Sequence, residues 1–276
     1  MTFLNNLVGD LRKCYDEIAK LDNIQARLEH FDVIELVAKY RTYWKPENVK
    51  VVLLAESHVY TQKLEMNSKI NLVHKDVDGC FREYVRFVYC LGYGEDSLLK
   101  DKHFLTAPNI GTLPFWKIFH SCCNEITEAN YRTTYNFLKK SHTGDGERIS
   151  NKINLLKRMR RHGIWLVDTS IVGLYQPGGE RFGESTLCDN IISVSWNNHV
   201  KNVVEEASPE YIICIGKGVA SIIQEDLDKM VDNKKIDDYE ILSQPTPFLG
   251  AGGLMKEFMK YYEICSRHCD FDSDSD

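Results

Sequence analysis

The sequence predicts an α/β protein in which helices cover both faces of a four-stranded parallel sheet. Four short runs are apolar and rich in β-branched residues, as is typical of strands buried on both faces, and they occupy residues 49–55, 163–167, 211–215 and 239–242. Segments with helical periodicity separate these runs, which implies right-handed crossovers between parallel strands. We therefore expect a three-layer α/β/α fold.

The chain opens with helical patterns that precede the first strand. Apolar residues from Leu4 to Leu21 follow the spacing of one helix face, and residues 31–37 continue in the same style. Pro46 interrupts the pattern ahead of the first strand. We therefore expect an amphipathic helix at the start and a second helical segment before the sheet begins.

The later helical patterns occupy residues 149–161, 196–207, 218–231 and 254–262. Residues 61–101 form an extra section inserted after the first strand, which we expect to be partly helical. No repeat or low-complexity linker divides the chain. We therefore expect a single domain over residues 1–269 and an acidic, disordered tail at residues 270–276.

Composition and charge argue against several classes of protein. The 276 residues are 43% hydrophobic and 27% charged, as in ordinary globular proteins, and no apolar run approaches the roughly 20 residues of a membrane span. The net charge of −6 argues against bulk electrostatic binding of nucleic acid, although the basic residues between 148 and 162 form either a local phosphate-binding surface or a solvated helix face. With no signal-peptide pattern, we expect a cytoplasmic protein, or a nuclear one in a eukaryote, without a membrane partner.

Patterns for metals and cofactors are missing. The nine cysteines are odd in number and include no Cys-x-x-Cys pair, so we expect reduced, mostly buried thiols. Cys265, His268 and Cys269 have helical spacing, but the second pair of ligands that a zinc site needs is missing. The glycine-rich patterns of nucleotide cofactor sites are also missing. We therefore expect no metal and no cofactor.

Polar residues follow the strands at the edge where open parallel sheets bind ligands. The residues after the four strands are, in order, Glu56-Ser57-His58, Asp168, Lys217 and Gln244-Pro245. Because the carboxyl ends of parallel strands meet at one edge, we expect these side chains to surround a common site.

The order and spacing of these segments resemble the uracil-DNA glycosylase superfamily, over roughly residues 45–265 apart from the extra section. That family has a four-stranded parallel sheet and a catalytic loop after the first strand, which reads Gly-Gln-Asp-Pro-Tyr-His in its best-known branch. A stacking aromatic residue and a proline-rich segment that opens a helix come next, and Phe104 and residues 107–119 resemble them. Residues 163–168 are similar to the second-strand motif Gly-Val-Leu-Leu-Leu-Asn, and residues 244–249 are similar to the closing His-Pro-Ser-Pro and leucine loop.

The resemblance implies a catalytic role for three residues. Glu56 would position or activate the attacking water, Ser57 stands where the best-known branch has aspartate, and Gln244 replaces the histidine that stabilises the leaving base. A neutral hydroxyl cannot neutralise a sugar cation, so Glu56 would carry that task. The structural alternatives are a helix cap or surface ion pair for Glu56, and a turn residue before Pro245 for Gln244.

Three further residues would bind the base. Phe104 would stack on it, His58 would donate a hydrogen bond to the base or a phosphate, and Asp168 would read its edge. Because an ionised aspartate only accepts hydrogen bonds, Asp168 suits an edge with two donors, as in guanine, better than uracil. The alternatives are a core position for Phe104, a local hydrogen bond for His58, and a cap for Asp168 on Thr169 or Ser170.

The loop after the fourth strand would contact DNA. Phe248 and Leu249 would enter the duplex as apolar wedges, with Pro245 and Thr246 beside them. Lys217, after the third strand, would add positive charge to the same surface. The expected partner is therefore single- or double-stranded DNA.

These residues predict a monomeric DNA glycosylase-like hydrolase. It would cleave the N-glycosidic bond of a flipped-out damaged or modified base and would not prefer uracil. Two alternatives stay open. The altered positions Ser57 and Gln244 favour a catalytically silent protein that binds DNA. The acidic composition and the section at residues 61–101, which could roof the pocket, are compatible with a binder of a free nucleoside or base.

Overall fold

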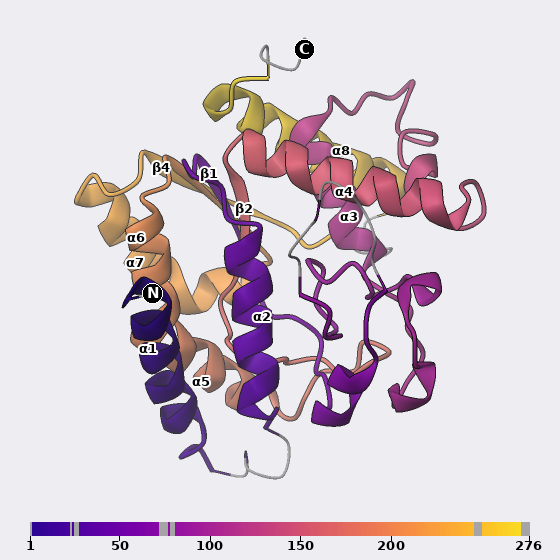
Figure 1. Cartoon of the computed structure of the whole chain (residues 1–276). Coiled ribbons are helices and arrows are strands. Elements are labelled where there is room, and N and C mark those ends of the chain that lie inside the picture. Colours follow the sequence, from indigo (N-terminus) through magenta and orange to yellow (C-terminus); the bar gives the residue numbers. More distant parts are fainter. Residues whose placement is uncertain are drawn as a thin grey trace.

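The computed structural model describes residues 2–22, 24, 28–71, 77, 81–245 and 250–271. Its centre is a sheet of four parallel strands in the order β2-β1-β3-β4 (Figure 1). The strands are β1 (Val51–Ala55), β2 (Ile164–Asp168), β3 (Tyr211–Ile215) and β4 (Asp238–Leu242). Every residue of β1, β2 and β3 is buried, whereas β4 is partly exposed at one edge. The predicted α/β class and the all-parallel sheet are confirmed.

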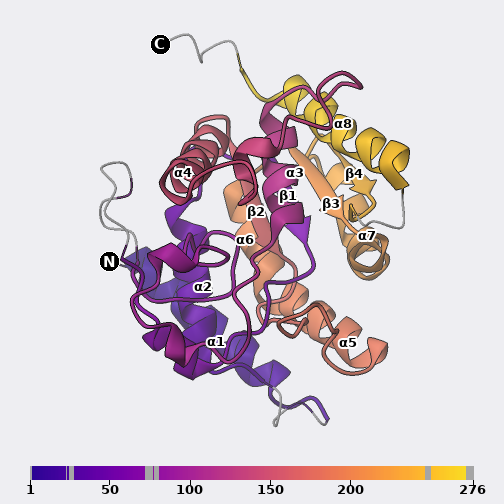
Figure 2. The ribbon, with the colours of Figure 1, turned by 90° about the vertical axis from the view of Figure 1, so that its right-hand side faces the viewer.

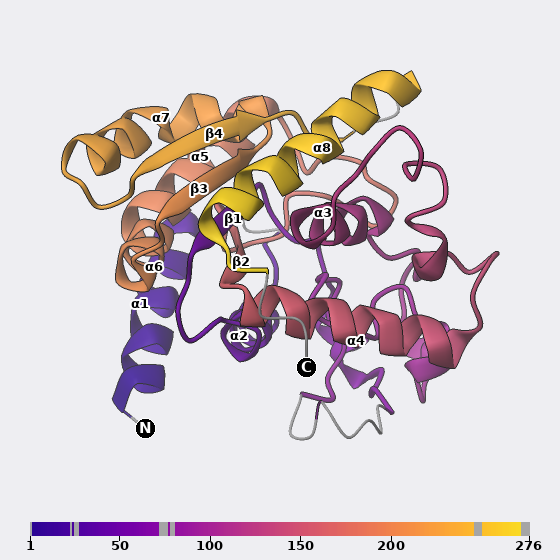
Figure 3. The same ribbon diagram turned by 90° about the horizontal axis from the view of Figure 1, so that it is seen from above.

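Two layers of helices flank the sheet. The α-helices are α1 (Thr2–Ile18), α2 (Phe31–Tyr43), α3 (Leu113–Cys123), α4 (Asp145–Arg161), α5 (Ser185–Ser195), α6 (Lys201–Ala207), α7 (Lys217–Asp232) and α8 (Gly250–His268). Helices α3, α4 and α8 pack together on one side, and α1, α5, α6 and α7 lie on the other with α2 beside α1 (Figure 2, Figure 3). The arrangement is consistent with the expected three layers.

The sequence pattern does not predict α5, although it does predict the helical segment that follows. Helix α5 continues through a π-helical turn at Trp196–Val200 into α6. Serine, threonine and β-branched residues give α5 a weak intrinsic helix preference. Burial of Cys188, Ile191 and Ile192 against the rest of the fold stabilises the helix instead.

The extra section at residues 61–101 is less helical than expected. Its described residues contain no α-helix, and short 3-10 turns lie at Lys63–Asn67 and Asp96–Leu98. Polar contacts hold this irregular backbone in place: the buried Glu65 carboxylate accepts two hydrogen bonds from Arg86, at 2.6 and 3.0 Å. The section is nevertheless part of the core, because its residues around Arg86 are buried.

The acidic end of the chain begins later than expected. The Asp270 carbonyl lies 2.7 Å from the His162 ring, and the Phe271 ring stacks on Tyr262 with centroids 5.9 Å apart. These two residues are therefore anchored to α8 and to the end of α4. The predicted tail residues 272–276 lie outside the described part of the chain.

The loops after β1 and β2 touch so closely that only glycine fits at position 173. A Cβ atom there would lie 2.5 Å from the Tyr60 backbone nitrogen. We expect Gly173→Ala to lower the free energy of unfolding by about 2–3 kcal/mol, measured by urea denaturation, because backbone cannot yield as a side chain does. Gly146→Ala is the matched control, since nothing lies near that position in α4. It should leave stability unchanged or raise it by up to about 1 kcal/mol. Equal losses in both variants would contradict the close contact.

Candidate functional site

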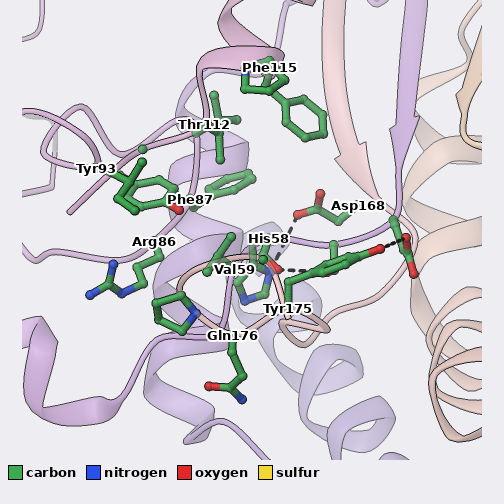
Figure 4. A pocket seen from close by; sticks show the side chains of 18 of the residues that line it. His58, Val59, Arg86, Phe87, Tyr93, Thr112, Phe115, Asp168, Tyr175 and Gln176 are labelled. Atoms are coloured by element: carbon green, nitrogen blue, oxygen red, sulfur yellow. Dashed lines mark hydrogen bonds and ion pairs between the residues drawn. The ribbon is translucent and has the colours of Figure 1, made fainter. Parts of the chain in front are cut away.

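A pocket of about 380 Å³ lies at the carboxyl ends of the strands (Figure 4). Segments that follow or end all four strands contribute to its lining. These residues are Glu56, Ser57 and His58 after β1, Asp168 at the end of β2, Ile215 at the end of β3, and Gln244 after β4. Residues from all four strand ends therefore lie around one pocket.

Aromatic and apolar side chains form the walls of the pocket. Phe87 and Tyr93 come from the section at residues 61–101, and Phe115 comes from the first turn of α3. Thr112, the N-cap of α3, also lines the pocket, and its hydroxyl has no hydrogen-bond partner among the described residues. The turn at residues 175–179 completes the lining. Sequence reasoning did not single out these wall residues, although the Gln-Pro-Gly-Gly run at 176–179 marks a turn.

Asp168 lies on the floor of the pocket with one carboxylate oxygen already paired. Its Oδ2 accepts a hydrogen bond from the Arg41 guanidinium at 2.8 Å. Its Oδ1 accepts no hydrogen bond from the described residues, and the carboxylate points into the pocket (Figure 4). The predicted cap on the next turn is wrong, because the Thr169 and Ser170 amides donate instead to the Ala55 and Glu56 carbonyls.

The structure places the His58 ring behind the pocket and not in it. The side chain is fully buried, and Nε2 lies 2.9 Å from the Glu29 carboxylate. On its other side, Nδ1 lies 3.8 Å from Asp168 Oδ2, which is an ion-pair distance and too long for a hydrogen bond. The expected direct contact of this ring with a base or phosphate is therefore corrected: its two neighbouring carboxylates seal it from a ligand.

The two carboxylates decide the charge of the His58 ring. Burial disfavours the charged imidazole, but Glu29 and Asp168 outweigh burial and raise the pKa of His58 to about 9. The ring is therefore an imidazolium at neutral pH.

Glu56 lines the pocket but is held by two partners. Its carboxylate accepts hydrogen bonds from the Tyr175 hydroxyl and the Arg181 guanidinium, both at 2.7 Å. The expected alternative of an ion pair is thus present in the structure. Each carboxylate oxygen still has a free lone pair, and the side chain keeps 20% of its surface exposed.

The other two proposed catalytic residues, Ser57 and Gln244, differ in whether their side chains are available to a ligand. The Ser57 hydroxyl donates to the His58 carbonyl at 2.9 Å and accepts from the Leu174 amide at 3.0 Å, so it links the loops after β1 and β2. Gln244 is exposed and lines the pocket. Its side chain is therefore available to a ligand at the pocket, whereas the Ser57 hydroxyl is already engaged.

The other residues predicted to contact a base or DNA do not line the pocket in the described part of the chain. Phe104 is not among the residues that line the pocket, and its ring lies against His103 with centroids 3.9 Å apart. Pro245 is buried, so the expected contact of its ring with DNA is corrected. Lys217 is exposed at the start of α7, outside the lining of the pocket. Thr246, Phe248 and Leu249 lie outside the described residues.

The basic stretch at residues 148–162 is not a continuous phosphate-binding surface. Arg148 and Lys152 are buried and pair with Glu95 at 2.6 and 2.5 Å. Their charges neutralise a carboxylate inside the fold and do not face solvent.

Within the described ranges, no helix is long and apolar enough to cross a membrane. The same ranges hold no cluster of three or more His, Cys, Asp or Glu side chains arranged to bind a metal ion. The eight cysteines they contain are buried free thiols.

Comparisons with protein-family models, curated proteins and solved structures found no match to this chain. The resemblance to the uracil-DNA glycosylase superfamily therefore depends on the motifs quoted above. What the pocket does has to be argued from its chemistry.

Proposed function

We propose that the protein is a DNA glycosylase-like hydrolase that takes an extruded base into this pocket and cleaves its N-glycosidic bond. The observation that carries the proposal is the convergence of Glu56, Asp168 and Gln244, from three different strand ends, on one pocket with aromatic walls. A glycosylase needs these parts together: a base-sized hollow, a group that reads the base, and a carboxylate near the sugar.

The walls and floor of the pocket suit a planar heterocycle. Phe87, Tyr93 and Phe115 offer faces and edges against which a base can pack. Asp168 Oδ1 and the Thr112 hydroxyl are unpaired polar atoms in an otherwise largely apolar lining. A ligand that leaves them unpaired would incur their desolvation cost, so they select for hydrogen-bonding groups at matching positions.

The pairing of Asp168 narrows the choice of base. Arg41 and the His58 ring both lie at Oδ2, so Oδ1 is the carboxylate oxygen that is left open to a ligand. An exocyclic amine, or a ring N–H beside one, satisfies that acceptor. Uracil fits poorly because carbonyl oxygens flank its ring N–H on both sides and would face the carboxylate.

Glu56 is the candidate for the chemical step. A sugar that loses its base becomes cationic, and a fixed carboxylate stabilises that charge and orients a water for attack. Tyr175 and Arg181 fix the carboxylate without using all its lone pairs. The Gln244 amide would donate a hydrogen bond to the departing base.

We expect base release from oligonucleotides that carry a damaged or modified base with an amine at the recognised edge. The panel is single- and double-stranded DNA carrying uracil, hypoxanthine, xanthine or oxidised guanine, and abasic sites are revealed by alkaline cleavage. Glu56→Gln should lower the rate at least about 100-fold while base binding persists, because it removes charge and keeps shape. Ser221→Ala, on an exposed face of α7, is the control and should keep full activity. No release from any substrate would contradict hydrolysis.

One observation favours a second function, binding without hydrolysis. The Ser57 hydroxyl occupies the place of the family's aspartate and is already engaged with backbone. In that case the same oligonucleotides would bind, Asp168→Asn would change which base is preferred, and no abasic site would form.

A further inference from the structure

Four buried ionisable side chains form a row behind the pocket. In order they are Glu29, His58, Asp168 and Arg41, and each is at least nine-tenths buried. Neither Glu29 nor Arg41 lines the pocket, and the His58 side chain has no exposed surface, so these three side chains act on a ligand through Asp168.

Glu29 is the innermost member of the row. Besides His58, its carboxylate accepts the backbone N–H groups of Thr61 and Gly173, both at 2.6 Å. The two amides and the His58 ring fix the position of this carboxylate. Glu29 itself does not line the pocket.

The geometry around His58 requires a charged ring. Its Nε2 meets Glu29, so in a neutral ring Nε2 would carry the proton and Nδ1 would present a lone pair to Asp168 Oδ2 at 3.8 Å. Two negative atoms would then face each other in a buried space. Protonation of Nδ1 converts that repulsion into attraction.

We propose that Glu29 is a positioning residue for the pocket: it holds His58 as an imidazolium, and that ring and Arg41 together hold the Asp168 carboxylate by Oδ2, with Oδ1 turned to the ligand. The orientation of the carboxylate on the floor is therefore set by a residue that never touches the ligand. The effect of Glu29 on ligand binding rests on the proposed function, whereas the protonation of His58 and the orientation of Asp168 do not.

The neighbouring side chains add no charge to the row of Glu29, His58, Asp168 and Arg41. The Phe87 ring, which carries no charge, forms a T-shaped contact with His58 with centroids 6.1 Å apart. Burial raises the pKa of Tyr89, next to Asp168 and Arg41, so its hydroxyl stays neutral. Burial lowers the pKa of His199, which lies near Arg41, to about 4, so that ring is neutral as well.

The test is the titration of His58, followed by NMR of its ring nitrogens in the whole protein. In the unsubstituted protein we expect both nitrogens protonated at pH 7 and a midpoint near pH 9. Glu29→Gln keeps the shape and removes the charge, so the midpoint should fall by at least about one unit. The carboxyl carbon of Asp168 should shift in the same titration. Glu95→Gln removes an equally buried carboxylate elsewhere and should leave both signals unchanged.

The outcomes separate the two proposals. A neutral His58 at pH 7 in the unsubstituted protein overturns the inference, even if Glu29→Gln fails to fold. A Glu29→Gln titration identical to that of the Glu95→Gln control overturns it as well. An imidazolium that Glu29→Gln neutralises, in a protein that binds no base or DNA, supports the inference and contradicts the proposed function. Where the oligonucleotide panel identifies a ligand, the alkaline limit of its affinity should shift toward lower pH in Glu29→Gln.

Discussion

Asp168→Ala is expected to lower the free energy of unfolding by about 3–5 kcal/mol, because it removes one partner from a buried ion pair. Arg41 would lose the carboxylate with which it pairs, and the His58 imidazolium would keep only Glu29 as a counter-charge. Both side chains are buried, so only water from the pocket can take the place of the lost carboxylate. Urea denaturation at pH 7 measures the loss.

A double-mutant cycle separates this ion pair from the rest of the effect. Arg41→Met alone should also destabilise the protein, and Arg41→Met with Asp168→Ala should cost less than the sum of the two single changes. Glu225→Ala is the control, since its partner Lys229 keeps 57% of its side chain exposed and can be solvated. Its loss of stability should be far smaller than that of Asp168→Ala. Additive single and double changes at Arg41 and Asp168 would contradict the coupling.

Stability is expected to decline with rising pH between pH 6.5 and 9, and His58 is the cause. In the folded protein the pKa of His58 is raised from 6.5 to about 9. The folded state therefore binds this proton more tightly than the unfolded chain does. The resulting stabilisation is complete below pH 6.5 and is lost as the pH rises through 9, by about 3 kcal/mol.

The comparison with His58→Gln isolates this contribution. Glutamine can still donate a hydrogen bond to Glu29, but it does not titrate. The difference in the free energy of unfolding between the two proteins should shrink from pH 6.5 to pH 8.5, a window below the ordinary pKa of cysteine thiols. A difference that stays constant with pH would mean that the His58 ring is neutral in the fold.

The sheet and the edge that carries the pocket could be predicted because their signals are local. Runs of β-branched apolar residues identified all four strands, and the polar residues that follow them, such as Glu56 and Asp168, lie at one pocket. That outcome depends only on the parallel arrangement of the strands, which the intervening helices imply.

The partners of those polar residues could not be predicted. Glu29 and Arg41 read in the sequence as ordinary charged residues of a surface helix region, and only the fold brings them to His58 and Asp168. The walls of the pocket come from irregular backbone around Phe87 and Tyr93, where no periodic pattern exists to detect. Phe104 shows the opposite case. It matches the stacking aromatic residue in the order of segments, but its ring does not line the pocket.

The three hydrogen bonds that Glu29 accepts also bear on how the chain folds. They join Glu29 to residues 29, 32 and 144 positions away along the sequence, so the set is complete only when the segment after β2 reaches Glu29. Closing so long a loop is slow, and until it closes the buried carboxylate lacks the donor at Gly173. The floor of the pocket should therefore assemble late and open only with the whole domain. The amides of Thr61 and Gly173 should accordingly exchange hydrogen at the rate of global unfolding.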